Sequence, residues 1–453
     1  MPHIDITVYK HERISYNLLV STSRHTNLFK YLKIVILVVF VIGFAGFGIA
    51  SLSNSRAATP YASLTAATGS LTGNASMQSD SALNAQYVLF GSSPISLAAC
   101  STSNATGAGS PSAVFTVGSP VSGDNSSQIQ AKIAQASAAG GGIVQLEAGT
   151  YLIDQTLNLA SNVELSGVGT TQTIIKAATT NISLVSAQNT SNVTLNNFTA
   201  DASGNTLADS NATLDYTINI INSSNVIVQN IATINPFSYS IVSNNSSNFC
   251  IRDNSVQVDT SNKYNQLDGI HIEGGTKGDV LDNYVDNRYN NALDGDDGLV
   301  AQGYHSNESY VTYAGNIVRG GNNGDCMQFA LGPGNISNIV VKDNEFWGCP
   351  FGIRTGGYAS SGAISNVTLD DNYIHNLVPG TGPYGSFPNG GNAVDLGGFL
   401  GTGQSSYNNT VSNTYICSAG SVVPESGTTI TNTTTVSGCT DAPSTTTPPP
   451  TMP

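Results

Sequence analysis

The chain has 453 residues and a formal net charge of −14, although only 10% of its residues are charged. This balance excludes a protein that binds nucleic acid or anionic lipid by charge, because such surfaces are recognised by clustered Lys and Arg. Stretches that favour long helices are scarce and short β-branched runs between polar turns are common, so the composition predicts a β-rich protein.

A strongly hydrophobic segment, residues 34–50, follows a basic stretch near the N-terminus. Its length is near the lower limit for crossing a bilayer, and the basic flank favours a cytoplasmic N-region, residues 1–33. Two interpretations stay open: a signal peptide cleaved after small residues, or an uncleaved transmembrane anchor that makes the membrane a partner. In both, the rest of the chain is extracellular or at the cell surface.

Residues 51–118 are rich in Ser, Thr and Ala and are interpreted as a linker. A short amphipathic helix is expected over residues 128–138, capped by Ser126 or Ser127, and short strands follow it. This order is typical of the capped N-terminus of a solenoid. We place the solenoid domain at residues 119–416, and a tail that ends in a Thr/Pro-rich stretch at residues 417–453.

Within the solenoid domain, a Ser-Asn pair followed by apolar residues recurs every roughly 24 to 33 residues, and an Asn closes each unit. The pairs begin at Ser191, Ser224, Ser247, Ser337 and Ser365. Asn is expected at such corners because it tolerates left-handed backbone geometry. Units this short, with no crossover helix, predict an all-β fold, a right-handed parallel β-helix with a short N-terminal capping helix.

The same period aligns a second strand in four units, which begin at Asp268, Asp297, Asp325 and Phe351. Equivalent positions lie about 5 Å apart in successive coils, so the three aspartates should stack, with Arg354 in the fourth coil. Stacked carboxylates raise one another's pKa values. They suit acid/base hydrolysis of glycosides, which in inverting enzymes uses carboxyls roughly 6.5–9.5 Å apart. Two alternatives stay open, a Ca²⁺ site and a corner-turn role for Asp-Gly pairs.

These segments resemble motifs of the polygalacturonase family. Residues 265–270 resemble its Asn-Thr-Asp-Gly motif with one extra residue, 295–298 its paired-aspartate motif, and 352–354 part of its Arg-Ile-Lys motif. The preceding helix and residues 140–150 are similar to the opening of the broader pectate-lyase-like superfamily. The motif-level likeness covers residues 265–357, and the general likeness covers residues 119–416.

The resemblance implies that Asp296 is the general acid, that Asp268 and Asp297 activate water for inverting attack, and that Arg354 binds substrate. Asp325, His271 and Gln328, which lie on the same strands, are further candidates for substrate contact. The partner is then a polysaccharide. We expect a monomer that needs no cofactor, with Ca²⁺ as the alternative.

The sequence departs from the family pattern at two positions. Asp325 stands where the Gly-His-Gly motif has its His, and Gly356 stands where Arg-Ile-Lys has its Lys. Both missing residues are basic, and the Lys of the family helps to hold a uronate carboxylate. A glycan less charged than a galacturonan is therefore expected. Several tyrosines are candidates for the floor of a sugar groove: Tyr304, Tyr310, Tyr313, Tyr358 and Tyr384.

Three functions remain in view: a glycosidase, a lyase or epimerase on the same fold, and a non-catalytic glycan-binding protein at the cell surface. A lyase usually needs a basic residue to remove a proton, and few basic residues lie near the aspartates. Six cysteines fit an exported protein, with Cys326–Cys349 and Cys417–Cys439 as the suggested disulfides. No Cys-x-x-Cys pair supports a zinc site.

Overall fold

The computed structural model divides the chain into two units, residues 1–98 and 99–453. It describes residues 6–11, 15–20, 62–65, 70–73, 75–80, 85–90, 100, 102–103, 105–111, 113–179, 182–203, 216–258, 267–288, 295–321, 324–382, 385–387, 391–417, 420–423 and 426–437. The hydrophobic segment 34–50 lies outside these residues. Within them, no helix is both long enough and apolar enough to cross a membrane.

The first unit consists of antiparallel strands. One sheet has the order β1-β2-β6-β5, and β3 pairs with β4. The strands are β1 (Ile6–His11), β2 (Ser15–Val20), β3 (Ala62–Thr65), β4 (Ser70–Gly73), β5 (Ala75–Asp80) and β6 (Ala85–Phe90).

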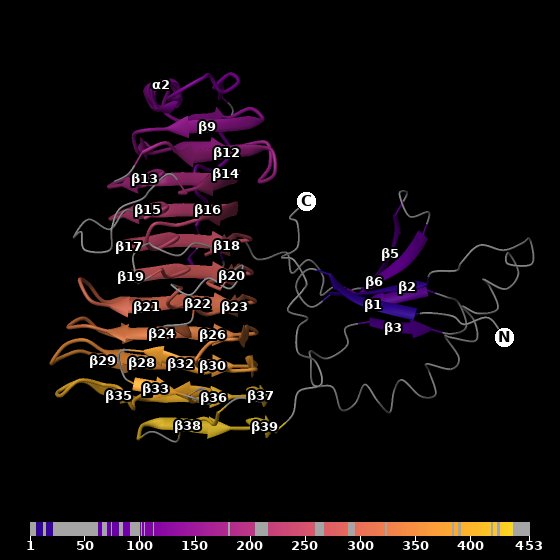
Figure 1. Cartoon of the computed structure of the whole chain (residues 1–453), viewed down its shortest axis with the longest axis vertical. Helices are drawn as coiled ribbons and strands as arrows, with labels where there is room; N and C mark the ends of the chain where they lie inside the picture. Colours follow the sequence, from indigo (N-terminus) through magenta and orange to yellow (C-terminus); the bar gives the residue numbers. More distant parts are fainter. Residues whose placement is uncertain are drawn as a thin grey trace, which may run out of the picture. The chain divides into compact units, whose positions relative to one another are not determined.

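The second unit is a stack of coils, with helix α2 (Ser126–Ala138) at one end and β38 and β39 at the other (Figure 1). The helix buries Ile129, Ile133 and Ala136 against the first coils, which covers the open end of the stack. Its N-cap residue is Asn125 rather than the expected Ser126 or Ser127. Ser126 lies in the first turn instead, where its hydroxyl donates to Asp124 at 2.6 Å.

Each coil contributes strands to three parallel faces, which we name A, B and C. The long strands β14 (Ser191–Asp201) and β16 (Ser224–Ile234) run from face B to face C, and β17 (Ile241–Arg252) and β19 (Ile270–Leu281) run from face A to face B. The other strands of face A are β10 (Leu157–Asn158), β13 (Val185–Gln188), β15 (Ile218–Ile221), β21 (Leu299–Gly303), β24 (Asp325–Leu331), β28 (Phe351–Gly357) and β34 (Val394–Asp395).

The other strands of face B are β7 (Val114–Thr116), β8 (Gly142–Gln145), β11 (Val163–Ser166), β22 (Glu308–Ala314), β25 (Ile336–Ser337), β26 (Val340–Lys342), β29 (Ala363–Ser365), β30 (Thr368–Asp370), β35 (Ser405–Tyr407), β36 (Asn409–Ser412) and β38 (Thr428–Thr431). Those of face C are β9 (Gly149–Ile153), β12 (Thr173–Ala177), β18 (Ser255–Gln257), β20 (Tyr284–Asp286), β23 (Ile317–Arg319), β27 (Glu345–Trp347), β31 (Tyr373–His375), β37 (Tyr415–Cys417) and β39 (Thr434–Val436). A separate antiparallel pair, β32 (Gly380–Gly382) and β33 (Gly385–Phe387), lies between β31 and β34 in the chain.

The register on face A agrees with the sequence alignment. Ile270 pairs with Leu299, Leu299 with Met327 and Met327 with Ile353, all in parallel. The parallel β-helix prediction is confirmed. The sheet extends beyond the predicted limits of 119–416, because β7 pairs with β8 at one end and β38 pairs with β36 at the other.

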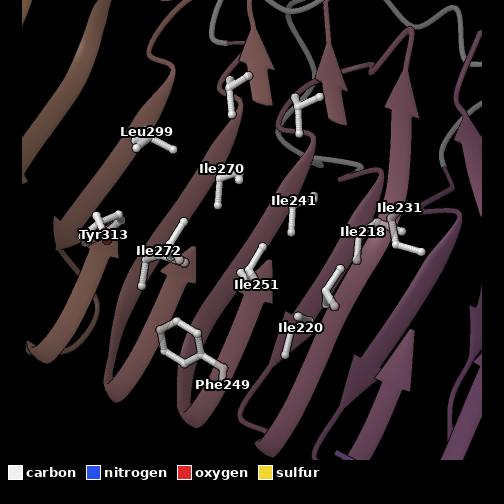
Figure 2. Packing of buried hydrophobic residues seen from close by; sticks show 14 of the residues in the cluster. Ile218, Ile220, Ile231, Ile241, Phe249, Ile251, Ile270, Ile272, Leu299 and Tyr313 are labelled. Carbon is white, nitrogen blue, oxygen red and sulfur yellow. The ribbon is translucent and has the colours of Figure 1, made fainter. Parts of the chain in front are cut away.

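The core is a set of apolar columns that run through the coils. Ile218, Ile241, Ile270 and Leu299 follow one another in register, and each is fully buried (Figure 2). Burying each such side chain contributes about 1.5–3 kcal/mol to stability. Alternation along each strand then directs the intervening polar residues outward.

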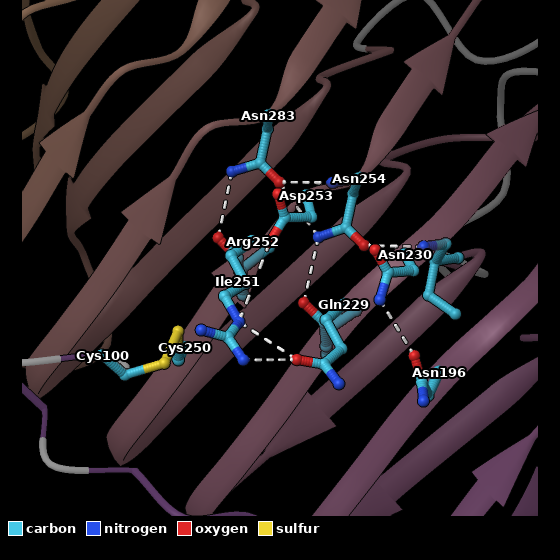
Figure 3. Close-up of polar contacts among 12 residues, drawn as sticks. Cys100, Asn196, Gln229, Asn230, Cys250, Ile251, Arg252, Asp253, Asn254 and Asn283 are labelled. Carbon is cyan, nitrogen blue, oxygen red and sulfur yellow. Dashed lines mark hydrogen bonds and ion pairs between the residues drawn. A yellow bond between two sulfur atoms is a disulfide. The ribbon is translucent and has the colours of Figure 1, made fainter. Parts of the chain in front are cut away.

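The asparagines of the repeat divide into two groups. Those of the Ser-Asn pairs, such as Asn225 and Asn338, have the left-handed backbone expected at corners. The buried closing asparagines form a ladder instead, in which each Oδ1 accepts from the N–H and Nδ2 of the one before it. The ladder contains Asn254, Asn283, Asn316, Asn344 and Asn372, and Figure 3 shows its first two members.

Asn316→Ala is expected to lower the free energy of unfolding by about 3 kcal/mol or more. The change leaves buried partners unpaired on both sides, including Asn283 Nδ2 and the carbonyl oxygen of Val280, and each such group costs about 1–3 kcal/mol. Urea denaturation measures the effect. The exposed Asn158→Ala serves as a control with a change within about 0.5 kcal/mol. Equal stabilities of the two variants would contradict the role of the ladder.

Two disulfides join described residues. The predicted Cys326–Cys349 pair is present with a Cα–Cα distance of 5.5 Å. Cys100–Cys250 was not predicted, and it connects residues 150 positions apart (Figure 3). It attaches the end of the presumed linker to β17. Ser103 binds the next strand, β19, by donating its N–H and its hydroxyl to Asp279 Oδ2 at 2.9 Å each. Cys417 is disulfide-bonded, and its expected partner Cys439 lies outside the described residues.

Candidate active site

The candidate site lies where three successive strands of face A begin. Asp268, Asp297 and Asp325 stand just before or at the start of β19, β21 and β24, and all three are buried. The backbone N–H of Asp297 donates to Asp268 Oδ1 at 3.2 Å, and that of Asp325 donates to Asp297 Oδ1 at 2.5 Å. The carboxylates of Asp268 and Asp297 therefore each cap the start of the next strand, in the column that the repeat predicts.

Asp296 brings a fourth carboxyl group to this column and is only partly buried. Carboxylate oxygens of Asp268, Asp296 and Asp297 all lie within 4.8 Å of one another. Gly324 lies against this group, since a Cβ there would collide with the backbone and carboxylate of Asp296. A residue without a side chain is therefore required at position 324.

The crowding of the carboxyl groups changes their acidity. Burial raises the pKa of Asp296 well above its ordinary value, and the charges of Asp268 and Asp325 raise it further. Burial and the neighbouring carboxylates, with Asp296 first among them, likewise raise the pKa of Asp297 well above its ordinary value. Such interacting groups lose their protons in successive steps, so one can hold a proton while the other is ionised. The cluster thus offers an acid and a base side by side.

The spacing is shorter than expected for an inverting pair. The nearest oxygens lie within 4.8 Å, whereas inverting glycosidases hold their carboxyls roughly 6.5–9.5 Å apart and retaining ones roughly 5–5.5 Å apart. The expected gap is therefore not found between the nearest oxygens of these three residues.

Arg354 forms a buried ion pair with Asp325. Its Nε and Nη2 lie 2.8 and 2.7 Å from Asp325 Oδ2, and its guanidinium lies 5.1 Å from the ring centroids of both Phe351 and Phe399. Burial lowers the pKa of Arg354, but the charge of Asp325 outweighs burial and raises it, so the guanidinium stays charged. Arg354 was expected to bind substrate; in the structure it pairs with Asp325, and its contact with substrate stays a prediction.

His271 lies on the other side of the column. Its Nδ1 is 2.7 Å from Asp268 Oδ2 and its Nε2 is 2.9 Å from Gln302 Oε1, while Tyr239 stacks on the ring at a centroid distance of 4.4 Å. Both ring nitrogens face acceptor oxygens, which the doubly protonated ring satisfies. Burial lowers the pKa of His271, but the hydrogen bond and charge of Asp268 outweigh it and raise the pKa. His271 therefore holds the Asp268 side chain in place.

Gln328 and Tyr358 lie beside the ion pair. The Tyr358 hydroxyl donates to Gln328 Oε1 at 2.9 Å, and Gln328 Nε2 lies 3.4 Å from Asp325 Oδ2. The tyrosines proposed for the floor of a sugar groove differ in their exposure to solvent. Tyr304, Tyr310 and Tyr358 are exposed, and Tyr384 lies outside the described residues. Tyr313 was wrongly included, because it is buried in the core and donates to Glu308.

Sequence reasoning missed Gln302, Tyr239 and Phe399. Gln302 stands in register with Glu273 one coil earlier, so the repeat could have placed it on the outward side of face A. No motif marked Phe399 or Tyr239, because they reach the site from segments outside the aligned strands. Asp395 was also missed, although it pairs in register with Arg354 and extends the series of buried charged residues by one coil.

A family model described as "Rhamnogalacturonase A/epimerase, pectate lyase-like" matches residues 121–372, more than half of the chain. The chain therefore belongs to this pectate-lyase-like family, and the predicted superfamily is confirmed. It is a carbohydrate-active parallel β-helix protein. A comparison with curated protein sequences found no match.

Solved structures of low sequence identity share the fold. An exopolygalacturonase from Thermotoga maritima aligns with a TM-score of 0.54 at 16% identity, over 74% of this chain and 96% of that one. A polygalacturonase from Erwinia carotovora aligns with a TM-score of 0.54 at 15% identity, over 72% and 94%. A tailspike of E. coli bacteriophage HK620, in complex with a pentasaccharide, has a TM-score of 0.54 at 16% identity, over 70% and 59%.

Proposed function

We propose that this protein is an exported glycosidase that hydrolyses a polysaccharide by acid/base catalysis. The observation that carries the proposal is the carboxyl cluster, in which Asp296 is partly exposed and has a raised pKa beside two buried aspartates. A raised pKa keeps a carboxylic acid protonated until it meets the leaving oxygen. The polygalacturonases among the similar structures support hydrolysis, and the pectate-lyase-like family supports a polysaccharide substrate.

The roles follow from the environment of each residue. Asp296 gives its proton to the glycosidic oxygen as the bond from C1 to that oxygen breaks. A water oxygen forms the new bond to C1, and its proton passes to the ionised carboxylate of Asp297 or Asp268. His271 orients Asp268 through its hydrogen bond, and Arg354 orients Asp325 in the same way.

Incubation with a panel of plant, algal and bacterial polysaccharides tests the reaction. We expect new reducing ends without the ultraviolet absorbance of unsaturated products, and Asp296→Asn serves as the inactive control. Unsaturated products would establish a lyase, and binding without any product would establish a non-catalytic protein. Proton NMR of the first product gives the anomeric outcome. Direct attack by water, as proposed here, gives inversion. Retention, which the short spacing of the nearest carboxyl oxygens favours, would make one of the aspartates a nucleophile.

The same three carboxylates offer oxygen ligands of the kind that Ca²⁺ prefers, which is the feature that favours a lyase or epimerase as the second candidate. Such a reaction also needs a base for proton removal. Arg354 is unsuited to that role, since it is buried and paired with Asp325. We therefore propose that a bound proton, rather than a metal cation, reduces the negative charge of the carboxyl cluster.

Removal of divalent cations with EDTA is accordingly expected to change the hydrolysis rate by less than about twofold, because protonation of the cluster relieves its repulsion without a metal. The initial rate with and without EDTA checks this. Loss of activity that added CaCl₂ restores, and MgCl₂ does not, would contradict it.

A further inference from the structure

Gly356 stands where the motif that the sequence resembles has a Lys. The ring of Tyr358 occupies the space that a side chain at this position would need. A Cβ on Gly356 would lie 2.9 Å from both Cε2 and the hydroxyl oxygen of Tyr358, which is closer than real Cβ atoms approach. Any side chain at position 356 would therefore have to displace the ring. Tyr358 is 46% exposed, so the ring also presents surface to solvent.

The polar partner of this ring is uncharged. Tyr358 donates its hydroxyl to Gln328, and Gln328 stands in register with Arg354 of the next coil, directly beside the Asp325 ion pair. An amide and a phenol supply hydrogen-bond donors and acceptors for sugar hydroxyls, but they bring no positive charge to a carboxylate.

The basic side chains that the structure describes near this part of face A already contact acidic partners. Arg354 is bound by Asp325 and His271 by Asp268, and the exposed His305 contacts the Glu273 carboxylate. The carboxyl groups of Asp296, Asp297 and Asp395 come in addition to these pairs. Even with Asp296 protonated, acidic groups outnumber basic ones in the described part of the site, which therefore opposes a carboxylate on the substrate.

We infer that Tyr358, with Gln328, forms a subsite for an uncharged sugar residue next to the bond that is cleaved. The sugar ring lies against the tyrosine ring, and its hydroxyls bond to the Gln328 amide and the phenol. This inference rests on the proposed glycosidase function, and it names the substrate class: a neutral polysaccharide, or a neutral residue within a mixed one, instead of a polyuronate.

Pairs of polysaccharides that differ only in charge test the inference. Polygalacturonate, rhamnogalacturonan and alginate are each compared with a derivative whose carboxyls are chemically reduced to alcohols, together with the neutral members of the panel. We expect hydrolysis of at least one neutral or reduced glycan with kcat/KM at least tenfold above that of any uronate form. Faster cleavage of a uronate form by the wild-type enzyme, lost in Asp296→Asn, would overturn the subsite and leave the glycosidase proposal standing.

Variants of Tyr358 separate ring contact from hydrogen bonding. Tyr358→Ala is expected to raise KM for the neutral substrate at least tenfold, whereas Tyr358→Phe, which keeps the ring, should raise it less than threefold. An unchanged KM in Tyr358→Ala would overturn the subsite. If no glycan yields any product, the glycosidase proposal fails. Affinity electrophoresis with the same pairs of glycans then tests the subsite independently. Stronger retardation of the protein by neutral glycans supports the subsite, and stronger retardation by uronates overturns it.

Discussion

Asp296→Asn is expected to lower kcat by roughly 10²–10⁴-fold with little change in KM, because general acid catalysis contributes about that much. Asn keeps the shape of the side chain but has no proton to give. Initial rates on the best substrate of the panel measure the effect. Asp371→Asn is the matched control, since Asp371 is exposed and Asn tolerates its left-handed backbone. Full activity of Asp296→Asn would remove this residue from the mechanism.

The same substitution is expected to make the protein more stable at neutral pH. The folded state raises the pKa of Asp296 above its unfolded value of about 3.9, so the fold favours the protonated form. The resulting stability is fully present below the unfolded pKa, and it is lost as the pH rises through the higher folded pKa. Asn does not ionise, so the variant escapes this loss.

Thermal melts of both proteins check this second effect. The pH range runs from about 4, near the ordinary pKa of a carboxyl group, to about 8. The difference in Tm between variant and wild type should grow as the pH rises. In wild type the hydrolysis rate should fall over the range in which Asp296 loses its proton, because the ionised acid cannot protonate a leaving group. A Tm difference that is the same at every pH would show that Asp296 does not have a raised pKa.

Arg354→Met is expected to lower the free energy of unfolding by about 3–5 kcal/mol, the effect of breaking a buried ion pair by removing one partner. Asp325 would keep a buried carboxylate without its guanidinium, next to a cluster that already repels it. The double variant Arg354→Met with Asp325→Leu should recover most of this loss, since it leaves no unpaired charge. Urea denaturation of the single and double variants measures both changes.

The exposed ion pair Lys342–Asp343, with side chains 48% and 53% exposed, provides the control. Lys342→Met should change stability by less than about 1 kcal/mol, because solvent screens such pairs. If Arg354→Met is as mild as this control, the guanidinium is not structurally committed to Asp325. It would then be available for substrate, as the resemblance implied.

The sequence predicted the fold well because the repeat is local. Apolar residues recur at one spacing in many coils, and a parallel stack is the arrangement that pairs each strand with its copy. The register on face A followed from the same spacing, down to the pairing of Ile270 with Leu299. The ends were less clear, since residues 114–116 and 428–436 pair with the sheet but carry no copy of the repeat motif.

The candidate site was only partly predictable. The repeat brought Asp268, Asp297 and Asp325 into one column, and it placed Arg354 in the coil that follows Asp325. It could not show that Arg354 is bound by Asp325, because that contact depends on rotamers and on the flanking Phe399 from a distant loop. The period determines which backbone positions are neighbours, whereas the side-chain directions depend on local packing.

The sequence by itself therefore determined the β-helix and the aspartate column, since both follow from spacing and residue type. The absence of two basic residues followed from comparing the sequence with the motifs that it resembles. Tertiary structure alone decided which charges neutralise each other, that His271 secures Asp268, and that the Tyr358 ring covers Gly356. It also decided that Cys100 reaches Cys250. The disulfide joins segments with no common period, so spacing could not predict it. The contacts of His271 and Tyr358 are local in the chain, but they depend on side-chain directions that spacing does not give.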